Sequence, residues 1–131
     1  MPQPIVYCLD ENTIDQVIVE RVIRRQAPHV EFHSLTTRQD AWRALCVHPR
    51  SFPSLLLMEV YYRRQLDTSL LDQLARMGRP PFPIIILSAD LSPQARLTLN
   101  QYSIIDAYLK KPFSVASAQI ALGYMSLDQV K

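Results

Sequence analysis

Four short apolar runs in this chain each end in charged or hydroxyl-bearing side chains. The runs cover residues 5–9, 55–58, 84–87 and 107–109. Short apolar runs with helical patterns between them are typical of strands in a parallel sheet that is buried on both faces. In such a sheet the carboxyl ends of all strands lie along one edge, so the polar residues that follow the runs are expected to meet there.

The residues expected at this edge are three carboxylates, a hydroxyl and an ammonium, supplied by Asp10, Glu11, Glu59, Ser88 and Lys111. Widely separated parts of the chain contribute them, so only the fold can bring them together. Such a group is suited to a cation or a phosphoryl group, because carboxylates bind hard cations and positive groups hold phosphoryl oxygens. The sequence therefore predicts a functional site at this edge of the sheet.

The rest of the chain completes a (βα)₅ pattern. Further strands are expected at about 30–35 and 104–109, and helices at about 13–26, 37–47, 69–77, 92–101 and 114–127. Candidate capping residues at the helix starts are Asn12 or Thr13, Thr37, Ser69 and Ser92. Right-handed crossovers then give an α/β fold with a doubly wound sheet of five parallel strands.

Two local features are also predicted. The first helix should bury Ile14, Val17, Ile18 and Val22, which repeat at helical spacing. Residues 48–53 and 60–67 are expected to be loops.

The composition fits one globular domain of 131 residues, with an ordinary hydrophobic share of 48% and a net charge of +2. The arginines near positions 21–25 and 63–64 are expected to lie on solvated faces, which argues against nucleic-acid binding by this domain. Cys8 and Cys46 fit core thiols in a reducing compartment. Because the chain has no run of 18 apolar residues, we expect a cytoplasmic protein without membrane contact.

Several kinds of enzyme lack support in the sequence. The three histidines, His29, His33 and His48, have no metal-ligand spacing with the cysteines. Ser88 is not part of a G-x-S-x-G elbow. The chain also contains no G-x-G-x-x-G or Walker A motif for a nucleotide. These absences argue against a zinc site, a serine hydrolase and a nucleotide-binding enzyme.

The polar positions at the strand ends resemble those of response-regulator receiver domains, and the resemblance covers essentially the whole chain. That family has an acidic pair after the first strand, a phosphoacceptor aspartate after the third, Thr or Ser after the fourth and Lys-Pro after the fifth. The matching residues are Asp10-Glu11, Glu59, Ser88-Ala89 and Lys111-Pro112-Phe113, with Tyr108 at an aromatic switch position. The resemblance implies a flavodoxin-like fold, strand order 2-1-3-4-5 and, commonly, a cis Lys-Pro peptide.

Two departures from the family pattern affect the expected chemistry. Glu59 stands where the family has its phosphoacceptor aspartate, and residues 60–67 lack the usual Met-Pro and Asp-Gly elements. One extra methylene moves the carboxylate by about 1.5 Å, and a misplacement of about 1 Å can already slow a reaction about 100-fold. Glu59 is therefore expected to be a poor acceptor. Tyr61 replaces a small or polar residue of the family, and its ring is expected to cover part of the site.

The sequence leaves three interpretations of Glu59 open. Glu59 can form a static ion pair with Lys111, it can partly mimic an activated state through Lys111 and Ser88, or it can accept a phosphoryl group. Asp10, Glu11 and Glu59 also offer oxygen ligands for a weak Mg²⁺ site, although Mg²⁺ demands near-ideal octahedral geometry. No cofactor is required by the first interpretation.

We therefore expect residues 1–131 to form a single pseudo-receiver domain that is not an enzyme and that regulates through protein interaction, alone or within a longer regulator. The alternative is a functional receiver that binds Mg²⁺ and accepts a phosphoryl group from a histidine kinase. Expected partners are a histidine kinase, an output domain, another regulator or a second copy of the chain. By resemblance, the interaction face is the fourth helix, fifth strand and fifth helix, which includes Tyr108. Helical spacing predicts that Leu91 and Leu97 point outward there if Ala95 and Leu99 point inward.

Overall fold

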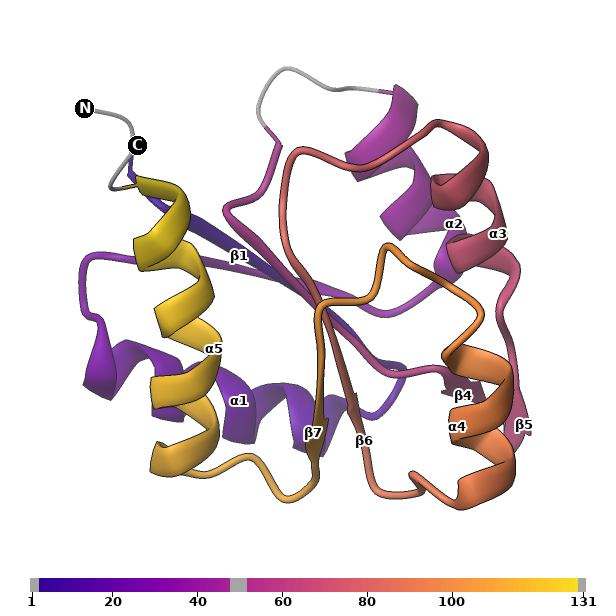
Figure 1. Cartoon of the computed structure of the whole chain (residues 1–131). Coiled ribbons are helices and arrows are strands. Elements are labelled where there is room, and N and C mark those ends of the chain that lie inside the picture. Colours follow the sequence, from indigo (N-terminus) through magenta and orange to yellow (C-terminus); the bar gives the residue numbers. More distant parts are fainter. Residues whose placement is uncertain (1–2, 48–51, 130–131) are drawn as a thin grey trace.

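The computed structural model describes residues 3–47 and 52–129. Its centre is a parallel sheet of five strands in the order β2-β1-β3-β6-β7 (Figure 1). The strands are β1 (Ile5–Leu9), β2 (Glu31–Leu35), β3 (Leu55–Met58), β6 (Ile84–Ser88) and β7 (Ala107–Lys110). Counted within this sheet, the order is 2-1-3-4-5, so the predicted doubly wound fold is confirmed.

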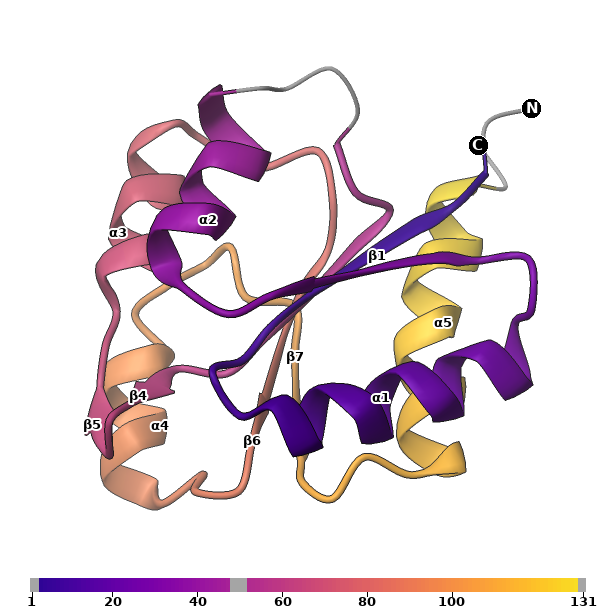
Figure 2. The ribbon, with the colours of Figure 1, turned by 180° about the vertical axis from the view of Figure 1, so that it is seen from behind.

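Helices cover both faces of the sheet (Figures 1 and 2). One face carries α1 (Thr13–Gln26) and α5 (Val115–Gln129). The other face carries α2 (Arg38–Trp42), which continues as a π-helical turn (Arg43–Val47), together with α3 (Ser69–Arg76) and α4 (Pro93–Leu99). The caps at Asn12, Thr37 and Ser92 are confirmed, because each side chain accepts a backbone N–H from its own helix.

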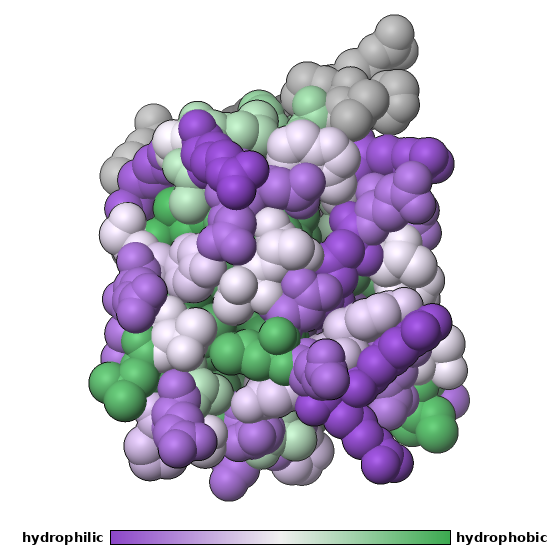
Figure 3. All heavy atoms as spheres, turned by 90° about the vertical axis from the view of Figure 1, so that its right-hand side faces the viewer, coloured by the Kyte–Doolittle hydropathy of each residue, from purple (hydrophilic) through white to green (hydrophobic). Residues whose placement is uncertain are grey.

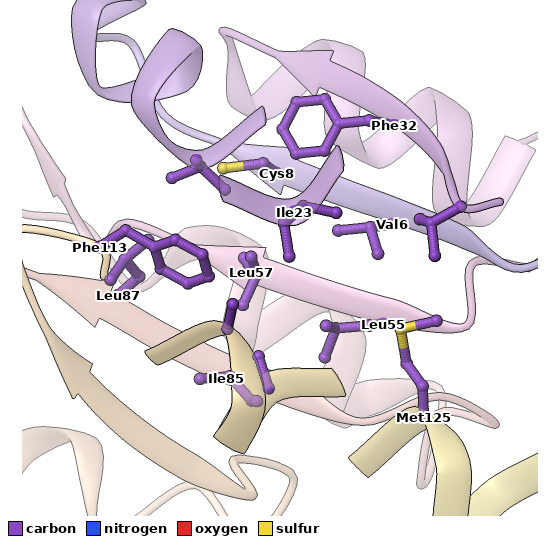
Figure 4. Packing of buried hydrophobic residues seen from close by; sticks show 14 of the residues in the cluster. Val6, Cys8, Ile23, Phe32, Leu55, Leu57, Ile85, Leu87, Phe113 and Met125 are labelled. Atoms are coloured by element: carbon purple, nitrogen blue, oxygen red, sulfur yellow. The ribbon is translucent and has the colours of Figure 1, made fainter. Parts of the chain in front are cut away.

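Every residue of β3 and β6 is buried, as expected for central strands covered on both sides. Successive side chains along these strands point to opposite faces of the sheet and belong to two separate hydrophobic cores. Figure 4 shows the core beneath α1 and α5, where Val6, Leu57 and Ile85 from the sheet face Ile23 and Phe113. Burial of the strands fixes their register, so the polar residues that follow them arrive together at one edge of the sheet.

Of the four α1 residues predicted to be buried, Val22 packs against the core, but Ile14, Val17 and Ile18 are exposed, so most of that prediction is wrong. Ile14 is 71% exposed and Val17 is 48% exposed. The helix instead buries Gln16, Val19 and Ile23. The physical reason is that the Gln16 amide nitrogen, Nε2, donates to backbone carbonyls at the ends of β1 and β2, which rotates the helix away from the purely apolar stripe.

The predicted loop at 60–67 is also wrong. It contains an antiparallel hairpin of β4 (Tyr61–Tyr62) and β5 (Gln65–Leu66). The two turn residues, Arg63 and Arg64, have φ values of 51° and 68°. Positive φ at both central residues is the geometry of the tight turns that match strand twist, although Asn-Gly is the usual sequence for it. Of the other predicted loop, residues 48–51 lie outside the described part of the chain.

Within the described residues, no helix is both long and apolar enough to span a membrane.

Candidate functional site

Lys111 lies at the centre of the carboxyl edge of the sheet, just after β7. Its ammonium nitrogen, Nζ, is 2.7 Å from Asp10 Oδ2, 2.8 Å from Asp15 Oδ2 and 2.9 Å from Glu59 Oε1. These distances are typical of charge-assisted hydrogen bonds. The predicted contact between Lys111 and Glu59 is therefore confirmed, and it is one of three.

Asp10 is carried by the end of β1 and is almost completely buried. One carboxylate oxygen, Oδ2, binds Lys111, and the other, Oδ1, accepts the backbone N–H of Asn12 at 2.9 Å. Burial raises the pKa of Asp10 above its ordinary value, and the bonds from Lys111 and Asn12 offset only part of that effect. Loss of the lysine would therefore leave a carboxyl group that ionises with difficulty.

Glu59 directly follows β3 and is buried as well. Its second carboxylate oxygen, Oε2, accepts the backbone N–H groups of Val60 at 2.9 Å and Tyr61 at 3.2 Å. Its own backbone carbonyl accepts a hydrogen bond from the Arg38 guanidinium at 3.0 Å. Both side-chain oxygens are thus engaged, and the longer side chain is folded back against the segment that follows it.

Asp15 was not predicted as a site residue. It belongs to the first turn of α1, and its side chain is 30% exposed. The available signal was an acid one turn into the helix that starts at the same edge of the sheet. Predicting its direction required the correct rotation of α1, which the apolar pattern did not provide.

Two predicted site residues point elsewhere. Glu11 is exposed, and its Oε1 accepts the backbone N–H of Arg63 in the hairpin turn at 3.0 Å. The Ser88 hydroxyl is buried and bonds to the backbone of Asp90, at 3.3 Å from N and 3.4 Å from O. The structure therefore joins Asp10, Glu59 and Lys111 with Asp15, without Glu11 or Ser88.

The residues expected at the interaction face lie on or near α4 and on β7. The Tyr108 hydroxyl donates to Asn100 Oδ1 at 2.9 Å, and the guanidinium carbon of Arg96 lies 4.2 Å from the centre of the Tyr108 ring. Leu97 is 71% exposed, as predicted. Leu91, which was expected to point outward, is partly buried against the core instead. The reason is that Leu91 precedes α4, so helical spacing does not set its direction.

One more predicted feature is confirmed beside the site, and Tyr61 makes contacts of its own. The Lys111–Pro112 peptide is cis, and Pro112 is exposed. The Tyr61 ring packs against the apolar core, and its side chain is hydrogen-bonded to Asp90. Burial, with a smaller contribution from Asp90, raises the pKa of the Tyr61 phenol. Tyr61 therefore links the hairpin to the segment after β6.

The ammonium of Lys111 remains charged in this setting. Burial acts to lower the pKa of Lys111, but the bonds to Asp10, Asp15 and Glu59 act more strongly in the opposite direction. The pKa is consequently raised above that of an ordinary lysine. Three carboxylates and one ammonium then leave an excess of negative charge at the edge.

A divalent cation does not fit these residues as they are arranged. Mg²⁺ prefers an octahedral set of oxygen ligands. Glu11 is held by the hairpin, and Lys111 Nζ lies among the carboxylates that remain. In residues 3–47 and 52–129, no group of three or more His, Cys, Asp or Glu side chains is placed to hold a metal ion. The predicted Mg²⁺ set of Asp10, Glu11 and Glu59 is not brought together.

Comparison with solved structures identifies the architecture. A two-component response regulator from Cytophaga hutchinsonii superposes with a TM-score of 0.82 at 18% identity, covering 97% of this chain and 99% of that one. This chain has the fold of response-regulator receiver domains. The Mn²⁺-bound response regulator Rcp1 matches with a TM-score of 0.74 at 14% identity, over 95% of this chain and 93% of its own.

A third similar structure is the phosphorylated cyanobacterial phytochrome response regulator RcpA, with a TM-score of 0.77, 14% identity and 96% coverage of both chains. No family model matches the sequence, and no curated protein matches it. The similarity therefore concerns the fold, and the chemistry of the site has to be judged from the residues of this chain.

Proposed function

We propose that residues 1–131 form a single receiver-like regulatory domain of the cytoplasm that acts by binding a protein partner and does not depend on phosphorylation. One observation carries this proposal. All three N–H groups of the Lys111 ammonium are directed at carboxylates of the chain itself, one of which is the phosphoacceptor-equivalent Glu59. A receiver needs this lysine for the transferred phosphoryl group, whose charge positive groups must stabilise.

The arrangement of Glu59 supports a static ion pair over mimicry of an activated state. Mimicry would require the Glu59 carboxylate to engage Ser88, but the Ser88 hydroxyl bonds to the backbone of Asp90. The second carboxylate oxygen of Glu59 accepts the backbone N–H groups of Val60 and Tyr61. A carboxylate fixed at both oxygens also lacks a free oxygen for in-line attack on a phosphodonor.

The surface of α4 is the best supported place for a partner. Figure 3 shows the side of the molecule that includes α4 and the hairpin, where separate apolar patches lie between hydrophilic side chains. Leu97 is a large apolar residue exposed on α4. An exposed apolar residue beside a polar rim suits a protein contact. The partner would be a histidine kinase, an output domain, another regulator or a second copy of the chain.

Phosphorylation is tested by intact mass. After incubation with acetyl phosphate and Mg²⁺, the wild-type protein is expected to keep its unmodified mass, because Glu59 is misplaced and Lys111 is occupied. Hydroxylamine treatment of a parallel sample identifies any acyl phosphate, because hydroxylamine attacks the acyl carbon and releases phosphate. A stoichiometric gain of one phosphoryl group would overturn the proposal in favour of a functional receiver.

Interaction is tested by substitution on α4. Leu97→Asp is expected to weaken self-association or partner binding by about tenfold or more, since it places a charge in an apolar contact. Glu59→Gln is expected to change the affinity by less than about twofold if Glu59 is structural, because a site that does not differ between two states cannot shift their populations. Thr98→Asp, at an exposed neighbouring position, controls for added charge. Sedimentation or titration at fixed protein concentration measures each affinity, and a larger effect of Glu59→Gln than of Leu97→Asp would contradict the proposal.

A further inference from the structure

The Asp15 carboxylate is held in place by a short series of hydrogen bonds at the start of α1. Asp10 Oδ1 accepts the N–H of Asn12, and Asn12 Oδ1 then accepts the N–H groups of Ile14 at 3.0 Å and Asp15 at 3.1 Å. These contacts fix the first turn of the helix directly beside the end of β1. The side chain of Asp15 is thereby directed at Lys111 Nζ, at 2.8 Å.

Asp15 completes the coordination of the Lys111 ammonium. A lysine ammonium has three N–H donors, and Asp10 and Glu59 take two of them. Asp15 takes the third. Its side chain is more exposed than those of Asp10 and Glu59, so the N–H that it covers is the one nearest to solvent.

The Asp15 carboxylate affects the approach of both anionic and cationic ligands. An incoming phosphoryl group would meet an ammonium with no free donor and would be repelled by three carboxylates. An incoming divalent cation would be repelled by the Lys111 ammonium, which already neutralises part of the charge of the three carboxylates. Without Asp15, one N–H of Lys111 would point toward solvent and one negative charge would be absent.

We infer that Asp15 is a positioning residue that closes this edge of the sheet by taking the last donor of Lys111, so that neither a phosphoryl group nor its donor can engage the lysine. This inference rests on the proposed function and adds a residue to it. Glu59 places the acceptor carboxylate in the wrong position for transfer. Asp15 instead occupies the Lys111 donor that would bind the phosphoryl group. The two effects can be separated by experiment.

The test uses the Glu59→Asp variant, which restores the shorter acceptor. Transfer from acetyl phosphate then forms a bond between a carboxylate oxygen at position 59 and phosphorus, while the bond from phosphorus to the acetate oxygen breaks and acetate leaves. We expect Glu59→Asp alone to be labelled slowly. Adding Asp15→Ala should raise the labelling rate by about tenfold or more, as expected when a charge-assisted hydrogen bond no longer competes.

The matched control is Glu20→Ala in the same Glu59→Asp background. Glu20 lies on the same helix and, within the described residues, pairs with the exposed Arg24 at 2.8 Å, so its removal is expected to leave the rate unchanged. Equal rates with and without Asp15→Ala, including no labelling in either, would overturn the inference. Labelling of the wild-type chain would instead overturn the proposed function, and the effect of Asp15→Ala on that rate would still test the role of Asp15.

A second measurement follows the ammonium directly and needs no phosphodonor. In the wild-type protein, the Lys111 ammonium should give a resolved nitrogen–hydrogen NMR signal, because protons held in hydrogen bonds exchange slowly with water. Asp15→Ala should accelerate this exchange by about tenfold or more, whereas Glu20→Ala should not change it. Unchanged exchange in a folded Asp15→Ala variant would show that Asp15 does not hold the donor.

Discussion

Replacing Lys111 by methionine is expected to lower the free energy of unfolding by about 3–5 kcal/mol at neutral pH. The substitution keeps most of the apolar stem but removes the positive group that is bonded to three carboxylates. Asp10 and Glu59 would remain buried without that partner, and removing one member of a buried ion pair is far more destabilising than losing a surface pair. Urea denaturation at pH 7 measures the loss.

The loss should depend on pH, in a direction set by the carboxylates. Burial already raises the pKa of Asp10, and Lys111 partly opposes this, so the pKa of Asp10 should rise further in Lys111→Met. An acid whose folded pKa exceeds its unfolded value of about 3.9 stabilises the fold fully below that value and loses this contribution as pH rises through the folded pKa. The deficit relative to wild type should therefore be small near pH 4 and grow toward neutrality.

Lys110→Met is the matched control, because Lys110 is the neighbouring lysine and is exposed. It is expected to change the free energy of unfolding by less than about 0.5 kcal/mol at either pH. A deficit in Lys111→Met that stays constant from pH 4 to pH 7 would contradict the electrostatic explanation and would point to a loss of packing instead.

The wild-type protein should also respond to alkaline pH. The pKa of Lys111 is raised in the fold, because the three carboxylate bonds outweigh the effect of burial. A base with a raised folded pKa stabilises fully below its unfolded value of about 10.4, and this contribution decreases as pH rises above that value. The ion cluster thus contributes throughout the neutral range.

The features that could be predicted from the sequence are those that depend on burial of whole segments. The runs 55–58 and 84–87 were predicted as buried strands and are buried throughout. Ser92-Pro93 predicted a helix start, and Ser92 caps α4. Once these strands were placed, the convergence of Asp10, Glu59 and Lys111 followed from topology alone, without knowledge of any side-chain contact.

The features that could not be predicted depend on single polar contacts. The hairpin at 61–66 has Arg63-Arg64 in a turn that usually carries Asn-Gly, so it gives no turn signal. The rotation of α1 was predicted from its apolar residues, but it follows the buried amide of Gln16. The same error concealed Asp15, since the direction of that side chain depends on the rotation of the helix.

Gln16 should therefore be among the most sensitive residues near the site. Its Nε2 lies 2.7 Å from the carbonyl oxygen of Cys8 and 3.1 Å from those of Asp10 and Leu35. Three carbonyl oxygens lie within hydrogen-bond distance of this atom, which assigns it as the amide nitrogen, whose two N–H groups they share. Gln16→Leu is expected to lower the free energy of unfolding by about 2–4 kcal/mol, because carbonyls at the end of β1 lose a buried donor.

Gln16→Glu tests the direction of these bonds, since it keeps the shape and replaces the donor with an oxygen. At neutral pH it should destabilise more than Gln16→Leu, because an ionised carboxylate would face three carbonyl oxygens in a buried position. The introduced carboxyl would have a raised pKa, so the protonated form, whose O–H can donate, should recover part of the stability as pH falls below about 5. Gln26→Glu, at an exposed position on the same helix, serves as the control. A Gln16→Glu variant that is as stable as wild type at pH 7, or that is not improved by acid, would show that the amide does not hold α1 against the ends of β1 and β2.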